Sequence, residues 1–243
     1  MDSSYLLPVC AEGRDWIAVE KPAGWMVHRS GLNREGPFLL QVLRDQLGYP
    51  VYPIHRLDRP TSGLVLFAKN AKAASRWGQA MQQGLFKKVY VPILRGWIDQ
   101  SQRVDYPLLE DGKTEKVEAV TIFTPVHLFK IPVQGWRFPS ARFTLCEVQL
   151  ETGRMHQIRK HAAHLRHPVI GDSRYGDLNQ NRFFAQHFGR NRLWLHARFI
   201  CFVGTETDEA PTASSPPPSE WRDLFHSLDL CQTERNWAWP KND

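Results

Sequence analysis

The sequence predicts a mixed α/β (α+β) domain, in which strands and helices follow one another along a single chain. The clearest strand covers 193–203, where every odd position is apolar, a period of two that is typical of a half-buried strand. The clearest helix covers 37–47, where apolar residues recur at helical spacing until Gly48 and Pro50 end the pattern. We therefore expect one sheet with helices packed against it.

Two further strands and a helix are expected in the amino-terminal half. A short strand over 15–19 ends in a Pro-Gly turn, and an apolar strand over 64–68 follows a turn-rich stretch. Asn70 is a suitable N-cap for a helix over 71–83. Residues 87–97 alternate as a strand, in which the central proline favours an edge position or a bulge.

The second half of the chain is less regular. Residues 99–140 are polar and turn-rich, and we interpret them as an insertion between two halves of one sheet. A strand over 141–150 and a helix over 154–166 follow. The predicted division is a domain over 1–203, a Pro/Ser-rich linker over 204–219 that is too polar to pack, and a helical tail over 220–243.

Composition excludes several classes of protein. Of 243 residues, 42% are hydrophobic and 23% charged, which is ordinary globular usage and excludes disordered, collagen-like and coiled-coil chains. No apolar run reaches the ~18–20 residues of a membrane span and no signal peptide precedes the domain, so we expect a cytoplasmic protein without membrane association. We expect all four cysteines to be reduced, because no CxxC spacing occurs among Cys10, Cys146, Cys201 and Cys231.

Positive charge is concentrated in one segment. From Arg154 to His167, eight of fourteen residues are Arg, Lys or His, and no carboxylate interrupts them. Such a helix face repels itself unless an anion lies on it, and basic and aromatic residues alternate onward to Arg192, a mixture that suits RNA. The alternative is a solvated helix face; a metal site is disfavoured because no cysteine or carboxylate joins the histidines.

The most unusual string is HRLDRPTSG, residues 55–63. Asp58 lies between two arginines in a loop directly ahead of an apolar strand, and such a strand holds a loop side chain accurately. Taken alone, Asp58 is explained more simply by an Asx turn with the amides of Thr61 and Ser62.

This string resembles the signature that carries the catalytic aspartate in pseudouridine synthases of the RluA branch. Other segments resemble motifs of that family in the same order: KPAG with VH at 21–28, KVY at 88–90, TGRMHQIR at 152–159, HPVIGD at 167–172 and RLWLHA at 192–197. The resemblance covers roughly residues 10–203. It implies the pseudouridine-synthase fold, a mixed and mostly antiparallel central sheet flanked by helices, with an active-site cleft across the sheet.

The resemblance also implies a role for each candidate residue. Asp58 is expected to act on the ribose at C1′ or C2′, Arg159 to pair with Asp58, and Tyr90 to lie against the flipped uracil and help remove its C5 proton. Arg56 is expected to enter the RNA stack that the uridine leaves. Further RNA contacts are expected from Arg154, His156, Lys160, Arg166 and Arg174. The isomerisation has no redox step, so no cofactor or metal is expected.

Segments 24–30 and 171–182 look most like the tRNA enzymes that modify uridine 65. A tRNA substrate is therefore expected, with a large-subunit ribosomal RNA as the alternative. The first motif begins at Lys21, so we expect no separate amino-terminal RNA-binding domain, and a monomer that needs no protein partner. Two alternative hypotheses place the protein in other functional classes: a non-catalytic RNA-binding protein of the same fold, and a ribonuclease built on His55, His156 or His196.

Overall fold

The computed structural model describes residues 5–29, 36–133, 139–205, 209–218, 221, 224 and 225. Its helices are α1 (Leu39–Leu47), α2 (Ala71–Gln82), α3 (Gln157–His164) and α4 (Leu178–Phe188). Its strands are β1 (Val9–Glu12), β2 (Trp16–Lys21), β3 (Tyr52–Pro53), β4 (Ser62–Ala68), β5 (Phe86–Arg95), β6 (Gln102–Asp105), β7 (Leu108–Leu109), β8 (Lys116–Val117), β9 (Val120–Pro132), β10 (Ser140–Leu150), β11 (Leu195–Phe202) and β12 (Thr212–Ser214).

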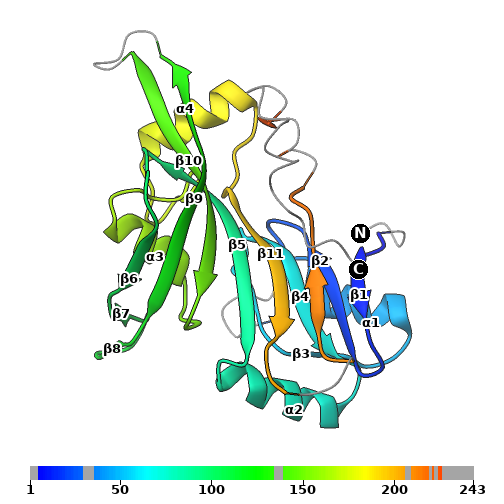
Figure 1. Ribbon diagram of the computed structural model, residues 1–243. Helices are drawn as coiled ribbons and strands as arrows, with labels where there is room; N and C mark the ends of the chain where they lie inside the picture. Colours follow the sequence, from blue (N-terminus) through cyan, green and yellow to red (C-terminus); the bar gives the residue numbers. More distant parts are fainter. Residues whose placement is uncertain are drawn as a thin grey trace.

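One sheet of ten strands organises these elements (Figure 1). Its main order is β1-β2-β4-β11-β5-β10-β9-β6, with β3 beside β4 and β12 beside β11. Only the β4–β11 pair among these is parallel, so the expected mixed, mostly antiparallel sheet is confirmed. Figure 1 shows two lobes, which we call the β4 lobe (β1 to β4 with α1 and α2) and the β9 lobe (β6 to β10 with α3 and α4).

Strands β2 and β4 of the β4 lobe bury both faces. Along β2, Ile17 and Val19 pack in one core cluster with α1, whereas Trp16 and Ala18 pack in another with α2. The two helices of this lobe lie where their sequences predict: Asn70 caps α2, and its side chain accepts a 2.9 Å hydrogen bond from the Ala73 amide. The lobe is thus a sheet between two helical layers.

One prediction about a strand is wrong, and for another strand the structure excludes one of two predicted alternatives, the edge position. The strand predicted over 193–203 is not half-buried, because β11 lies between β4 and β5 and its even positions His196, Arg198 and Ile200 are buried as well. β5 is not an edge strand, although it contains Pro92. Its pairing with β10 skips Val91 and Pro92, so the missing proline N–H falls where the ladder is interrupted.

The predicted division of the chain is also wrong in two places. Residues 99–140 are not an insertion outside the sheet, since β9 pairs with β10 along eleven positions and β6 pairs with β9. Residues 204–219 are not an unpacked linker, because β12 pairs with β11 and Ala213 and Ser215 are buried. The packed unit continues to Trp221, Leu224 and Phe225, which are buried against the β9 lobe, whereas the rest of the predicted tail lies outside the described residues.

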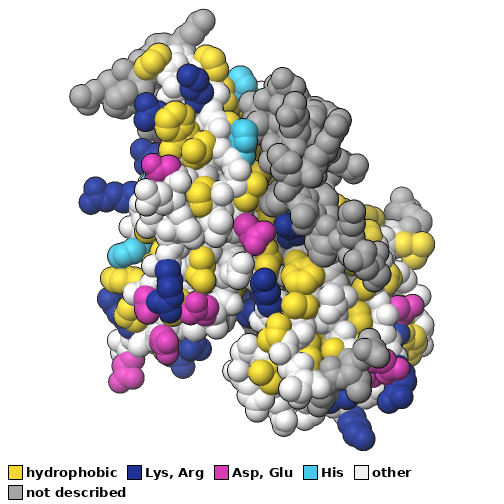
Figure 2. Space-filling model, viewed as in Figure 1, with side chains coloured by type: hydrophobic (Ala, Val, Ile, Leu, Met, Phe, Trp, Pro, Cys, Tyr) yellow, Lys and Arg dark blue, Asp and Glu magenta, His cyan; other side chains and the backbone are white. Residues whose placement is uncertain are grey.

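Charged side chains of both signs share the surface of the fold that Figure 2 shows. On the face in Figure 2, Lys and Arg side chains are scattered among Asp and Glu over both lobes. Cys10, Cys146 and Cys201 are free thiols as expected, and Cys231 lies outside the described residues. Across the described part of the chain, no helix has the length and apolarity to cross a membrane.

Gly63 is the closest contact between β4 and β11. It has a φ of 112°, and a Cβ there would overlap the backbone of Ala197, its partner in the parallel pair. We expect Gly63→Ala to lower the free energy of unfolding by at least about 3 kcal/mol, through backbone strain and overpacking.

Urea unfolding measures this effect, and Gly78→Ala is the matched control. Gly78 lies in α2 with nothing near its added Cβ, so alanine there should raise stability by about 0.5–1 kcal/mol. Equal stability of the two variants would contradict the close approach at Gly63.

Candidate active site

A pocket of about 530 Å³ lies where the two lobes meet. Its walls come from the loop before β4, the end of α2, β5 and the segment that joins β10 to α3. The lining residues that carry chemistry are His55, Arg56, Asp58, Lys88, Tyr90, Arg154 and His156. The sequence therefore brings three separate motifs to one cavity.

The loop that carries Asp58 is tied to the turn after β2. The Lys21 side chain is fully buried, and its ammonium donates to the carbonyls of Pro22, Trp25 and Arg59 at 2.8–3.1 Å. Arg59 also exchanges two hydrogen bonds with Gly24, one through its carbonyl and one through its side chain. Burial lowers the pKa of Lys21 to about 7, an effect that Asp58 opposes. The KPAG turn thus fixes the residue that follows Asp58.

The Asp58 side chain does not close an Asx turn; it points at Arg159. Its Oδ2 accepts a 3.2 Å hydrogen bond from Arg159 Nη1, while its backbone carbonyl accepts from the Thr61 amide. The Asp58 side chain is 23% exposed and that of Arg159 only 6%, so the pair faces the pocket from one side and the core from the other. The structure brings Asp58 and Arg159 together as the sequence analysis expected.

Arg159 is itself held by Asp172, a residue with no role in the sequence analysis. Its Nε and Nη2 donate to the two carboxylate oxygens of Asp172 at 2.7 and 2.8 Å. Asp172 is fully buried and also accepts from the amides of Arg174 and Tyr175. Burial opposes the charges of both groups, but their pairing keeps the pKa of Asp172 low and that of Arg159 high.

His156 occupies a strained position beside the same carboxylate. It caps α3 with φ 58° and ψ 24°, a left-handed conformation that is uncommon outside glycine, so the helix begins later than predicted. Its Nε2 is 3.8 Å from Asp58 Oδ2, and its Nδ1 is 3.0 Å from the Tyr175 hydroxyl. Burial and the neighbouring cations lower the pKa of His156, and Asp58 opposes them.

The turn around His156 is held by the buried side chain of Gln157. Its carbonyl oxygen accepts from the Thr152 hydroxyl and the Arg154 amide, and its amide nitrogen donates to Val120 and Thr121 of β9. These four bonds join the TGRMHQIR segment to the sheet and compensate the local strain.

Tyr90 lies in the pocket wall with 9% of its surface exposed. Burial and the charge of Asp58 raise the pKa of its hydroxyl, so the phenol stays protonated. It can therefore contact a base with its ring and donate a hydrogen bond, whereas a phenolate is strongly disfavoured.

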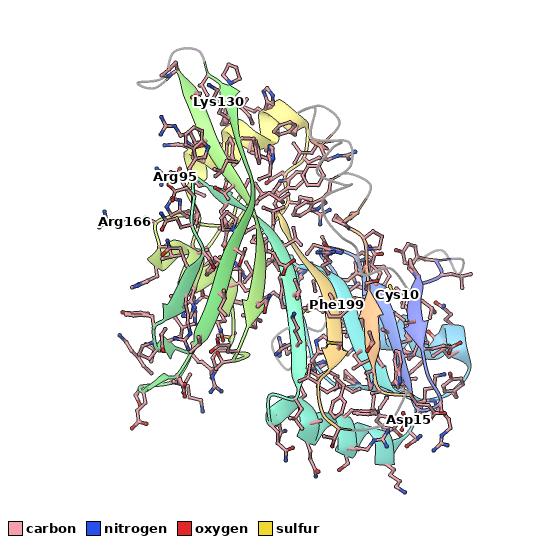
Figure 3. All side chains as sticks on the ribbon, in the orientation of Figure 1. Cys10, Asp15, Arg95, Lys130, Arg166 and Phe199 are labelled. Atoms are coloured by element: carbon pink, nitrogen blue, oxygen red, sulfur yellow. The ribbon has the colours of Figure 1, made fainter. Side chains whose placement is uncertain are left out.

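The predicted RNA-binding residues separate into two groups. Arg56, Arg154 and His156 line the pocket, whereas Lys160, Arg166 and Arg174 do not. Lys160 donates to the carbonyl of Leu109, and Arg174 pairs with Asp111 at 2.8 Å, so both hold the β7–β8 hairpin against α3. Figure 3 shows Arg166 at the outer edge of the β9 lobe, on the side away from β4 and β11.

The three histidines of the basic segment have separate partners. His161 is buried and bonds to Thr121 and Tyr106, His164 stacks on the Tyr106 ring, and His167 bonds to the carbonyl of Arg95. Among the described residues, no three His, Cys, Asp or Glu side chains are grouped as a metal site would require.

Sequence reasoning missed three residues that position this site: Lys21, Gln157 and Asp172. All three lie inside the motifs that were recognised, so a signal was present.

Comparison with known proteins agrees with this geometry. A sequence model described as RNA pseudouridylate synthase matches residues 15–164. The chain is 39% identical over 230 residues to the tRNA pseudouridine synthase C of Vibrio parahaemolyticus, covering 90% of this chain and 94% of the relative. It is 45% identical over 192 residues to that of Salmonella typhi, covering 74% of each chain.

Solved structures share the fold. The human RNA pseudouridylate synthase domain containing 1 superposes with a TM-score of 0.70 at 23% identity, over 93% of this chain and 87% of that one. The human domain containing 4 gives the same TM-score at 21% identity, over 91% and 93% of the chains. The expected fold is therefore confirmed.

The Arg159–Asp172 pair leads to a prediction about the site. We expect Asp172→Asn to lower the free energy of unfolding by about 3 kcal/mol, because the buried guanidinium of Arg159 loses its buried, bidentate partner and keeps only Asp58 at the pocket. Turnover should fall about 10²-fold, because Arg159 no longer holds Asp58 in place.

Urea unfolding and steady-state kinetics test both effects. Asp111→Asn is the matched control, since it removes the exposed partner of Arg174 and should change stability and turnover little. Parental stability and turnover in Asp172→Asn would refute the anchoring role.

Proposed function

This chain belongs to the RNA pseudouridylate synthase family, and we propose that it converts uridine 65 of a tRNA to pseudouridine. The observation that carries the proposal is the Asp58–Arg159 pair, which places a carboxylate in a pocket beside Tyr90. In this isomerisation the N1–C1′ bond breaks, the uracil turns over, C5 bonds to C1′, and the C5 proton is lost as N1 gains one.

Asp58 acts on the ribose of a uridine that has left its stack. The target base must be flipped into the pocket, at a cost of a few kcal/mol that contacts with the RNA offset. Asp58 then either attacks C1′ or removes a proton from C2′, and both routes need it ionised. The guanidinium of Arg159 donates a hydrogen bond to the carboxylate and orients it, and the contact of Arg159 to Asp172 keeps the guanidinium in place.

Tyr90 supports the base during this rearrangement. The ring of Tyr90 on β5, buried apart from the part that lines the pocket, offers the uracil a stacking surface worth ~1–3 kcal/mol. Because the hydroxyl of Tyr90 has a raised pKa, we assign it stacking and hydrogen-bond donation, and its help in removing the C5 proton stays a prediction.

RNA contacts are assigned by position. Arg56 is exposed at the pocket, which supports its entry into the stack that the uridine leaves, and Arg154 and His156 line the same cavity. Arg166 has no side-chain partner among the described residues and is exposed at the outer edge, where it can reach an RNA phosphate, whereas Lys160 and Arg174 already bond within the protein and contribute less.

The alternatives from other classes have less support. A non-catalytic RNA clamp has no need of an arginine that links two carboxylates at a pocket. A ribonuclease needs titrating histidines, but burial lowers the pKa of His55 to about 4 and that of His196 to about 3.

Transfer RNA is favoured over ribosomal RNA by the relatives. Proteins from Vibrio and Yersinia that match 90% of this chain are named tRNA pseudouridine synthase C. The position, uridine 65, follows from the motif resemblance of segments 24–30 and 171–182. We further propose that the protein acts in the cytoplasm as a monomer and needs no protein partner.

Asp58→Asn tests the chemistry. The substitution keeps the shape and removes the charge, so we expect pseudouridine formation to fall at least 10³-fold while the Kd for tRNA changes less than about threefold. The measurement is tritium release from C5 of labelled uridine together with filter binding. Asp45→Asn, an exposed carboxylate on α1, should behave as the parent. Turnover above a few per cent of the parental rate in Asp58→Asn would contradict the assigned role of Asp58.

Mapping pseudouridine in cells that lack the protein tests the substrate. We expect the loss of pseudouridine at tRNA position 65, and its return on complementation with the parent but not with Asp58→Asn. Loss of a ribosomal RNA site with tRNA position 65 intact would overturn the substrate and leave the chemistry standing.

A further inference from the structure

Lys88 is a charged side chain in the pocket that the reaction described above does not use. It lies on β5 two residues before Tyr90, so both side chains leave the same face of the strand and both line the cavity. Lys87, its neighbour, is exposed. Lys88 therefore faces the substrate and not the solvent side of the sheet.

Within the described part of the chain, the ammonium of Lys88 has no hydrogen bond or ion pair. This distinguishes it from Lys21, which is saturated by three carbonyls, and from Arg159, which is shared by two carboxylates. Asp58 is the one carboxylate among the lining residues and is already paired. Lys88 is half-buried, and burial lowers its pKa, so holding its charge costs free energy until an anion arrives.

The neighbourhood keeps room for that ammonium. A Cβ at Gly153 would come within 3.2 Å of Lys88 Nζ, so the side chain extends from β5 to the loop that begins the TGRMHQIR segment. Arg154 follows in the same loop and lines the pocket too. Lys88 and Arg154 thus place two cations on the side of the cavity where this loop faces β5.

Of the groups that a flipped nucleotide carries, only its phosphates are anionic. Uracil and ribose are neutral, and the proposed place of the uracil is against the ring of Tyr90. Two residues along a strand span about 7 Å, so Lys88 lies one sugar-phosphate step from a base that contacts Tyr90. A phosphate bound there would pair with the ammonium of Lys88.

We propose that Lys88 binds a backbone phosphate next to the flipped uridine and so holds the nucleotide in the pocket. The inference rests on the proposed function, because it takes the ligand to be an RNA nucleotide. Lys88 is a substrate-binding residue in this scheme, and its contribution appears in RNA affinity and not in the chemical step.

A chemical double-mutant cycle tests the inference. The RNAs are minihelices that contain tRNA uridine 65, with all phosphates intact or with a neutral methylphosphonate 5′ or 3′ to that uridine. The proteins are the parent, Lys88→Met and Lys88→Arg, and Kd is measured as a function of salt. We expect Lys88→Met to weaken binding about 10-fold and to reduce the salt slope by roughly one phosphate contact, with kcat at saturating RNA within threefold of the parent.

The coupling identifies the phosphate. One of the two methylphosphonate RNAs should bind the parent about 10-fold more weakly than the intact RNA does. The same modification should weaken binding to Lys88→Met less than threefold, because the contact is already lost in that variant. Lys88→Arg, which keeps the charge, should retain most of the affinity. Lys87→Met is the matched control on the exposed face, and its effect should be independent of both modifications.

Two results would overturn the inference. If each methylphosphonate weakened binding by the same factor in the parent and in Lys88→Met, Lys88 would contact neither flanking phosphate. A variant with parental affinity but a depressed kcat and a shifted pH profile would place Lys88 in the chemistry instead. Because the cycle is read from affinity, it is decided whether or not pseudouridine forms; failure of the parent to convert the intact RNA would count against the proposed function alone.

Discussion

The buried pair between Arg159 and Asp172 is the interaction on which the site depends. A guanidinium presents two parallel donors in a rigid fork, and Asp172 engages that fork while the remaining Nη1 reaches Asp58. Asp172 is in turn fixed by two backbone amides. The orientation of the Asp58 carboxylate is therefore set from the core outward, and the charge on Arg159 persists despite its burial.

A second constraint brings the loop of Asp58 to that guanidinium. Lys21 joins the turn after β2 to the carbonyl of Arg59, and Gly63 lets β4 lie directly against β11. Both contacts link segments that are far apart in the sequence. The position of a loop is set by the elements to which it is bonded. Strand β4 and the ammonium of Lys21, both buried, therefore hold Asp58 more accurately than its own turn could.

The basic segment shows how one stretch of chain can serve two purposes. Its charge suggested a face for RNA, yet Arg159 and His161 point inward and bond to protein groups, and Lys160 holds the β7–β8 hairpin. Arg154 and His156 face the pocket. The charge was recognised correctly as unusual, but a linear count cannot separate side chains that bind substrate from those that hold the site together.

What the sequence determined by itself is what depends on neighbours along the chain. The helices over 39–47 and 71–82 follow from apolar spacing and the Asn70 cap, and Asp58, Tyr90 and Arg159 follow from motifs whose residues are local. The tertiary structure decided which surfaces are covered: β9 became part of the sheet, residues 212–215 were packed, and β11 was buried on both faces. It also brought Asp172 to Arg159 as its buried partner. Strand pairing and burial join residues distant in sequence, and their energies depend on what lies opposite, which no local pattern contains.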